Sequence, residues 1–258
     1  EFLPISSSGH LAVLQNFLAI GDMENHMLFD VLLHLGTLAA VILAFWKDVR
    51  EVVTEFARML HIRRTPRGMK PNRRERRLIS FLIIATLPLI PAVFLSNVVE
   101  SLYQNTFFIG FAFILTGFLL FAADRMGHGN KDERSSTTAD ALVVGLAQAV
   151  AVVPGLSRSG TTISFGMLRG FERSFAVKFS FLLSIPAVLG ANLVSLIKVF
   201  STGVEWSYVP MYLVGVACAF VSGYFAIYFL RLVVQRGKFG GFCYYCCFDA
   251  RSRRSVVG

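Results

Sequence analysis

The stretch FAVKFSFLLSIPAVLGANLVSLIKV, at residues 175–199, is a long apolar run that contains only two charged side chains. A helix of this length is long enough to cross a hydrocarbon layer about 30 Å thick. Five more apolar stretches accompany it in the chain, at 28–46, 78–98, 107–123, 139–153 and 209–230. The sequence therefore predicts an all-α, polytopic membrane helical bundle.

Composition supports this class and excludes others. Hydrophobic residues make up 55% of the 258 residues and charged residues 16%, whereas soluble domains carry about 25% charged residues. So much apolar side chain excludes disorder and disfavours a soluble enzyme. Continuous apolar runs also disfavour a membrane β-barrel, whose strands alternate in hydrophobicity. The four cysteines are expected to be free thiols, because no further ligands complete a zinc site around Cys243 and Cys246.

The net charge of +9 is distributed as in a membrane protein. Residues 61–77 hold eight basic residues against one acid, and residues 231–258 hold six more. Basic clusters between apolar spans indicate cytoplasmic loops, and no aromatic residue is interleaved as nucleic-acid binding would require. We therefore expect no nucleic acid partner. Loop 124–138, the turn after residue 168 and the chain after residue 231 also fall inside, while 21–27, 99–106 and 201–208 fall outside.

Two apolar segments, 1–19 and 139–168, are interrupted by Pro, Gly and Ser. Such interruption predicts broken, re-entrant helices, which occur at membrane depth where they are buried in protein or line a wet cavity. By the charge rule, the first segment dips in from outside and the second from inside. Opposite entry predicts inverted-topology repeats with halves of about 1–123 and 124–235. An offset of 150 supports the repeat by matching five pairs of identical residues: Pro4/Pro154, Ser7/Ser157, Phe29/Phe179, Leu32/Leu182 and Leu33/Leu183. The polar site is then expected where the halves meet.

The second interrupted segment contains PGLSRSGTT at residues 154–162, which has the chemistry of an anion site. The guanidinium of Arg158 presents a planar fork of donors that matches phosphate oxygens. Hydroxyls of neighbouring Ser and Thr residues add neutral donors, and a helix starting near Thr161 directs its positive end at an anion. The alternative is that Ser and Gly permit close helix packing while Arg158 reaches toward the interface.

The first segment contains EFLPISSSGH at residues 1–10, which supplies a carboxylate and an imidazole. His10 can transfer protons or attack phosphorus, and Ser7 and Ser8 are candidate nucleophiles. Glu1 can orient the imidazole or bind a cation. For His10 the alternative is a packed, hydrogen-bonded histidine, and for Ser6 and Ser8 it is helix packing. Asp30 and His34 share one helix face and are interpreted as supporting or packing polar groups.

Together the two motifs closely resemble the family of undecaprenyl-diphosphate phosphatases of the BacA/UppP type, the bacitracin-resistance proteins. The resemblance runs from residue 1 to about residue 235. It implies an integral phosphatase of the bacterial plasma membrane, multi-pass, with inverted repeats and re-entrant helices. It further implies hydrolysis of undecaprenyl diphosphate, which recycles the lipid carrier of cell-wall synthesis. The site would open to the outer side, and a divalent cation, Mg²⁺ or Ca²⁺, would support activity.

Residue by residue, the resemblance implies roles for both motifs. Glu1 matches the second Glu of the family's E-x-x-x-E pattern, and Ser7 and His10 match its catalytic Ser and His. Arg158, with Ser157 and Thr162, matches the phosphate-binding loop, and we extend that loop to Ser159 and Gly160. Glu1 is thus also the expected metal ligand.

Two departures from the family accompany the resemblance. The first Glu of the E-x-x-x-E pattern precedes residue 1, so the expected metal pair is incomplete, and the chain is expected to lack its N-terminal part. Residues 236–258 form a basic, Cys-rich tail in place of a final apolar span, which suggests a truncated or frame-shifted end. A single membrane domain is expected over 1–235.

The function expected from all this is in-line phosphoryl transfer on a polyprenyl diphosphate among membrane lipids. Arg158 would hold the terminal phosphate, and Ser7 would attack with His10 as base; attack by His10 itself or by water stays open. A rival hypothesis is a transporter or lipid flippase with a midplane anion site; a structural scaffold leaves the paired loops unexplained. We expect the two broken segments to touch, and His10 and Arg158 to line one cavity, which favours the hydrolase over the transporter.

Overall fold

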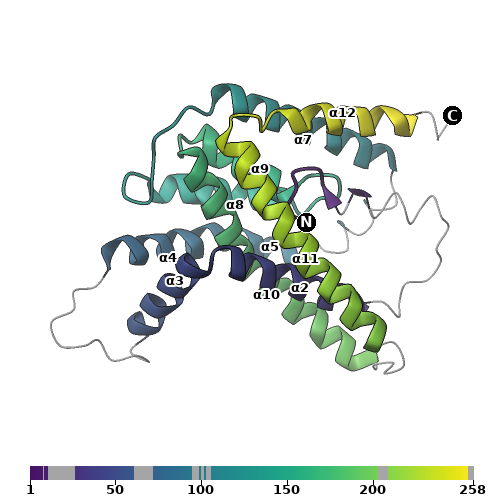
Figure 1. Ribbon diagram of the computed structural model, residues 1–258, viewed down its shortest axis with the longest axis horizontal. Coiled ribbons are helices and arrows are strands. Elements are labelled where there is room, and N and C mark those ends of the chain that lie inside the picture. The colour runs from purple at the N-terminus through teal and green to yellow at the C-terminus, as the bar shows by residue number, and fades with distance from the viewer. Residues whose placement is uncertain are drawn as a thin grey trace.

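The computed structural model describes residues 1–7, 9–10, 27–60, 72–94, 99, 102, 106–202 and 209–254. Within these residues the regular secondary structure is helical, apart from one isolated bridge between Lys131 and Phe171, and turns and loops connect the helices. The helices, shown in Figure 1, are α2 (Met27–Ala44), α3 (Trp46–Met59), α4 (Arg73–Thr86), α5 (Leu89–Phe94), α7 (Thr106–Met126), α8 (Thr138–Val150), α9 (Arg158–Leu168), α10 (Arg173–Thr202), α11 (Val209–Gln235) and α12 (Gly241–Arg254). The expected all-α class is confirmed.

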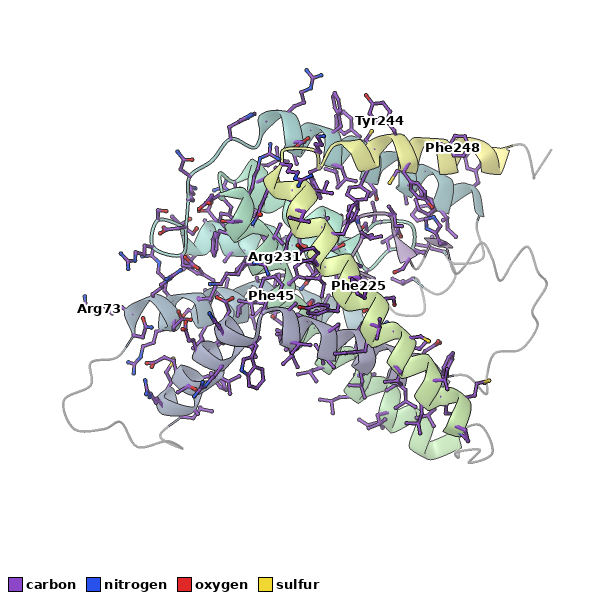
Figure 2. The ribbon with its side chains drawn as sticks, in the orientation of Figure 1. Phe45, Arg73, Phe225, Arg231, Tyr244 and Phe248 are labelled. Carbon is purple, nitrogen blue, oxygen red and sulfur yellow. The ribbon has the colours of Figure 1, made fainter. Side chains whose placement is uncertain are left out.

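Three helices of the described part are long and apolar enough to cross a membrane, namely α7, α10 and α11. They correspond to the expected spans 107–123, 175–199 and 209–230. Their outward faces carry exposed large side chains such as Phe107, Phe118 and Leu213, and Phe225 likewise projects from α11 in Figure 2. Apolar side chains on the outside of an apolar bundle are what lipid contact requires. The protein is therefore a multi-pass membrane protein.

The expected spans at 28–46 and 78–98 take a different form. The first continues beyond α2 into α3 after a bend of 93° at Phe45, and the pair qualifies together as one broken span. The second is divided into α4 and the short α5 by a turn at Leu87 and Pro88. Proline explains this break, because Pro88 lacks the N–H that would continue the hydrogen-bond ladder.

Ion pairs hold together the loops that the charge rule predicts to be cytoplasmic. Glu133, in the connection after α7, is buried and accepts from Arg74 of α4 and Lys178 of α10, each at 3.0 Å. Arg173, at the start of α10, pairs with Asp124 at 2.5 Å and reaches the carbonyl oxygen of Val234 near the end of α11. The described parts of the four expected cytoplasmic connections thus lie at one end of the bundle. Residues 61–71 lie outside the described residues.

The second broken segment enters and leaves at this same end. Asp140, in the first turn of α8, pairs with Arg169, just after the end of α9, at 2.8 Å. The two helices are therefore antiparallel arms, joined by residues 151–157 at their far tip. A capping box between Thr137 and Asp140 begins α8, and Ser157 caps α9 by accepting from the N–H of Gly160. The expected re-entrant shape is present here.

The first broken segment is described only in part, because residue 8 and residues 11–26 lie outside the described residues. Its direction of entry, and with it the inverted symmetry of the two halves, stays a prediction. The repeat-related helices α2 and α10 pack against each other. Figure 1 shows them side by side below the N-terminal segment.

The chain beyond residue 235 is part of the bundle. Helix α12 packs along α7, as Figure 1 shows at the top of the view. Cys246 is fully buried, and the N–H of Gly240 donates to Asp124 at 2.9 Å. Tyr244 and Phe248 face outward, as labelled in Figure 2. The tail that the sequence marks as atypical is thus a helix with one face inside and one outside.

The core between the helices is rich in phenylalanine. The fully buried side chains include Phe81 of α4, Phe179 and Phe181 of α10, and Phe171 and Phe239 from connections. At its edge, Arg231 of α11 lies over the ring of Phe45 at 5.0 Å, and both are labelled in Figure 2. This core holds the helices from which the polar site is built.

Candidate functional site

The two broken segments meet, although about 150 residues separate them in the sequence. The hydroxyl of Ser159 donates to the carbonyl oxygen of Phe2 at 3.0 Å. A Cβ atom added at Gly160 would stand 3.0 Å from the Cβ of Pro4, so the backbone of α9 runs directly against the first segment. The expected contact between the segments is confirmed.

A small cavity lies between the segments and α10. It is lined by Glu1, Phe2, Arg158, Ser159, Thr162, Ser180, Phe181 and Ser184. Its volume is about 10 Å³, which is close to the least space that one water molecule needs. A phosphate group is larger than water, so the cavity has to widen before such a group can enter.

The carboxylate of Glu1 and the guanidinium of Arg158 face this same cavity from the two different segments. They are close enough for their charges to interact. Even so, Arg158 has no hydrogen-bond or ion-pair partner for its side chain among the described residues. A cation without a partner beside an apolar core is costly, and this marks the position as a site for an anion.

The hydroxyls expected to bind phosphate are largely committed to the loop itself. Ser157 accepts from the N–H of Gly160 at 3.2 Å and so caps α9. Ser159 donates to Phe2, as described above, and Thr162 donates to the carbonyl oxygen of Arg158 at 2.9 Å. In this arrangement they shape the loop, while Arg158 and the positive end of α9 remain directed at an anion. Their role toward phosphate stays a prediction.

Glu1 is held by α2, which the sequence did not indicate. Thr37 donates to one carboxylate oxygen at 2.5 Å, and His34 Nε2 lies 3.1 Å from the other. From the sequence, His34 is interpreted as a supporting or packing group on the helix face that it shares with Asp30. The spacing of His34 and Thr37 on one helix face was visible in the sequence, but nothing linked that face to Glu1.

The position of His10 differs from expectation. Its Nδ1 lies 2.8 Å from the carbonyl oxygen of Ser6 and its Nε2 lies 3.0 Å from the hydroxyl of Tyr245. Its ring packs edge-on against Phe113 of α7. The residues that line the cavity with Arg158 do not include His10. The prediction that His10 and Arg158 line one cavity is therefore wrong for this structure.

The physical reason lies in the short helical turn that begins at Ser7. Ser6 precedes it with a positive φ of 57°, and the N–H of Gly9 points back to the Ser6 hydroxyl at 3.4 Å. The turn carries the imidazole toward α7 and α12 rather than toward α9. Ser7 is exposed, and Ser8 lies outside the described residues. The catalytic roles expected for Ser7 and His10 stay predictions.

Two further hydroxyls reach the cavity from α10, namely Ser180 and Ser184. Ser180 lies 2.6 Å from the hydroxyl of Thr162. Neither serine is among the residues predicted from the sequence. The offset of 150 does relate them to polar residues of α2, since it aligns Ser180 with Asp30 and Ser184 with His34. The repeat thus pairs a polar face of α2 with a polar face of α10.

The described residues do not form a cation site by themselves. No group of three or more His, Cys, Asp or Glu side chains gathers in the part of the chain that the structure describes. Both oxygens of Glu1 are already engaged by Thr37 and His34. Mg²⁺ and Ca²⁺ also take oxygen ligands from water, and Mg²⁺ is often held by one or two carboxylates together with substrate phosphates, so a cation bound through Glu1 stays a prediction.

Comparison with known proteins gives a consistent result. A family model described as bacitracin resistance protein BacA matches residues 1–250. The undecaprenyl-diphosphatase of Alkaliphilus metalliredigens is 40% identical over 247 residues, which are 95% of this chain and 89% of that protein. The undecaprenyl-diphosphatase of Halothermothrix orenii is 38% identical over 250 residues, with 95% and 88% covered. That of Syntrophotalea carbinolica is 40% identical over 247 residues, with 95% and 89% covered.

Proposed function

This chain belongs to the bacitracin resistance protein BacA family, and from that membership and the site's geometry we propose that it hydrolyses undecaprenyl diphosphate. The products are undecaprenyl phosphate and inorganic phosphate. This reaction recycles the lipid carrier for cell-wall synthesis. It also removes the diphosphate form of the carrier, and bacitracin resistance depends on this removal. The observation that carries the proposal is the meeting of Glu1 and Arg158 at one cavity, between segments from opposite parts of the chain.

The chemistry follows from the charges at this cavity. Phosphoryl transfer depends on positioning and on neutralising negative charge rather than on covalent chemistry by the protein. The guanidinium of Arg158 can bind two phosphate oxygens at once, and the N-terminus of α9 adds partial positive charge. Glu1 lines the same cavity, where its carboxylate can orient the attacking group.

The attacking group is proposed to be Ser7 or water, with His10 as its base, and undecaprenyl phosphate leaves as the phosphoanhydride P–O bond breaks. If Ser7 attacks, water then hydrolyses the phosphoserine and releases inorganic phosphate. A carbonyl oxygen only accepts, so the contact with Ser6 places a proton on His10 Nδ1 and leaves Nε2 as the acceptor for Tyr245. Nε2 is the basic nitrogen, so His10 serves as a base only when Tyr245 gives up this contact. We expect Tyr245 to release His10 when the cavity widens to admit the substrate.

No step is routed through a divalent cation, because Glu1 is the one described residue that the family resemblance gives as a ligand. The family resemblance predicts cation dependence all the same. It is checked by treating the purified protein with EDTA and restoring Mg²⁺ or Ca²⁺ separately. Restored activity would require oxygen ligands from the diphosphate itself or from outside the described residues.

The protein is proposed to lie in the bacterial inner membrane, with the site open to the outer side. Support comes from the basic loops, which gather at the end opposite to the tip of the α8–α9 segment. Substrate added to the outside of intact spheroplasts is expected to be hydrolysed. Hydrolysis only after lysis would place the opening on the cytoplasmic side.

The decisive experiment is phosphate release in detergent. The purified chain is mixed with C55 diphosphate, and inorganic phosphate is measured over time. A hydrolase needs no second compartment, whereas a transporter or flippase moves its substrate without releasing phosphate. Sustained phosphate release supports the proposal, and its absence from well-folded protein contradicts it.

A further inference from the structure

Helix α2 holds the carboxylate of Glu1 by both oxygens. Thr37 donates to Oε2 at 2.5 Å, and His34 Nε2 lies 3.1 Å from Oε1. The two side chains are three residues apart on α2 and therefore lie on one face of the helix. The carboxylate is thus fixed in direction, and it is turned toward α2 although Glu1 also lines the cavity.

The other side of the imidazole is anchored too. His34 Nδ1 lies 2.7 Å from the carbonyl oxygen of Asp30. A carbonyl and a carboxylate both only accept hydrogen bonds, so each ring nitrogen of His34 must carry a proton for both contacts to form. When Glu1 is ionised, the pair is an imidazolium and a carboxylate, in which the charge of Glu1 is balanced by His34.

Arg158 faces the same cavity and its guanidinium has no partner among the described residues. Glu1 is the carboxylate beside it. Without His34 and Thr37, the Glu1 carboxylate would swing to this guanidinium, since a bidentate Arg–carboxylate pair is the stronger contact. Such a pair would occupy the donors that a phosphate needs.

We propose that His34 is a positioning residue that, together with Thr37, keeps Glu1 away from Arg158 and so leaves the guanidinium available to the substrate's phosphate. The proposal rests on the proposed function, because it names what prepares that site for its anion. His34 does not itself line the cavity and acts through Glu1.

The test uses four variants of the full chain, with Glu1→Gln and His128→Leu as two reference variants, in detergent with C55 diphosphate. His34→Leu removes the imidazole contact with Glu1 and leaves that of Thr37, and it is expected to raise KM about tenfold or more, the loss of one good contact. His34→Gln keeps an N–H donor toward Glu1 and is expected to stay within about threefold of wild type in KM. Thr37→Val removes the second donor with little change in shape and is expected to raise KM less than His34→Leu does.

The fourth variant, Glu1→Gln with His34→Leu, separates this role from a merely structural one. Removing the carboxylate leaves nothing to occupy Arg158, so KM should return to that of Glu1→Gln alone while kcat stays low. A packing defect caused by His34→Leu would persist in the double variant. His128→Leu, at an exposed histidine after α7, is the matched control and should leave KM unchanged.

The outcomes distinguish the two proposals. No phosphate release by the wild-type chain overturns the proposed function. An active wild-type chain with an unchanged KM in His34→Leu, or with no return of KM in the double variant, overturns the positioning role. If His34→Leu does not fold, then Thr37→Val and His34→Gln decide: an unchanged KM in Thr37→Val, or a tenfold rise in His34→Gln, contradicts it.

Discussion

The charge of Arg158 lowers the stability of the fold and at the same time suits the residue to bind an anion. Its cation stands beside an apolar core without a hydrogen-bond or ion-pair partner among the described residues, while the hydroxyls around it hold the loop in shape. A charge kept without a partner lowers stability. The substrate's phosphate would supply a partner for the guanidinium, and this contact would contribute to substrate binding.

Arg158→Lys is expected to lose most activity. Lysine keeps the charge but lacks the planar fork, so contacts of about 3 kcal/mol are lost and turnover slows roughly a hundredfold. Phosphate release from C55 diphosphate measures the loss. Arg236→Lys, at an exposed position after α11, is the control and should behave as wild type. Near-normal turnover in Arg158→Lys would mean that Arg158 acts only as a point charge or in packing.

At the scale of elements, the re-entrant segment depends on close contact between α8 and α4. A Cβ atom added at Gly145 would stand 2.5 Å from the carbonyl oxygen of Ala85 and 2.6 Å from its Cα. Both obstacles are backbone atoms, so no side chain can move aside. The absence of a side chain at Gly145 therefore sets how closely α8 lies on α4.

Gly145→Ala is expected to destabilise the protein by about 1–3 kcal/mol, because α8 must move away from α4. Gly190→Ala is the matched control, since Gly190 is also helical and an added Cβ would meet nothing within 4 Å. That change should leave stability equal or raise it by about 0.5–1 kcal/mol through helix propensity. Thermal unfolding in detergent compares the two, and equal midpoints would contradict the close contact.

Across the bundle, buried charges join the helices at the end where the connections after α7 and α9 lie. Burial alone would raise the pKa of Glu133, but hydrogen bonds from Arg74 and Lys178 outweigh it and the pKa is lowered. Lys178 also pairs with Asp48 of α3, so this network connects α3, α4, α10 and the loop after α7. Ion pairs thus hold the helices together at this end of the bundle, where the apolar core ends and the loops begin.

This network predicts a loss of stability in acid. A carboxyl group whose pKa is lower in the folded state stabilises the fold above its unfolded pKa, near 4.5. That contribution is lost as the pH falls from about 4.5 through the lower folded value. Unfolding in detergent across this range measures the effect, and Glu133→Gln should flatten the dependence. An unchanged pH profile in Glu133→Gln would show that Glu133 does not contribute.

The same end is expected to face the cytoplasm. In a background without native cysteines, Gly68→Cys should resist a membrane-impermeant maleimide in intact cells, because loop 61–77 carries eight basic residues. Gly203→Cys, in a connection with one acid and no base, should be labelled. Labelling of Gly68→Cys from outside would reverse the topology.

Much of the bundle and half of the site could be predicted from sequence. Arg158 and Glu1 were recognised because ionisable groups in apolar segments are expensive, and the meeting of their segments followed from the need for both at one phosphate. The bend at Phe45 carries no Pro or Gly, so no local feature of the sequence predicts it. The direction of His10 depends on the backbone at Ser6 and on Tyr245 of α12, which motif spacing does not contain.

The α8–α9 segment also sets an order of events during synthesis. As it leaves the ribosome, neither arm is long enough to remain across the lipid bilayer unaided, since α8 has 13 residues and α9 has 11. Its partners α4 and α7 are already in place, but Ser180, which contacts Thr162, belongs to a helix not yet made. The nascent chain therefore cannot seat this segment when the translocon first releases it. Biogenesis of the site has to wait for the C-terminal helices, although its residues are translated before them.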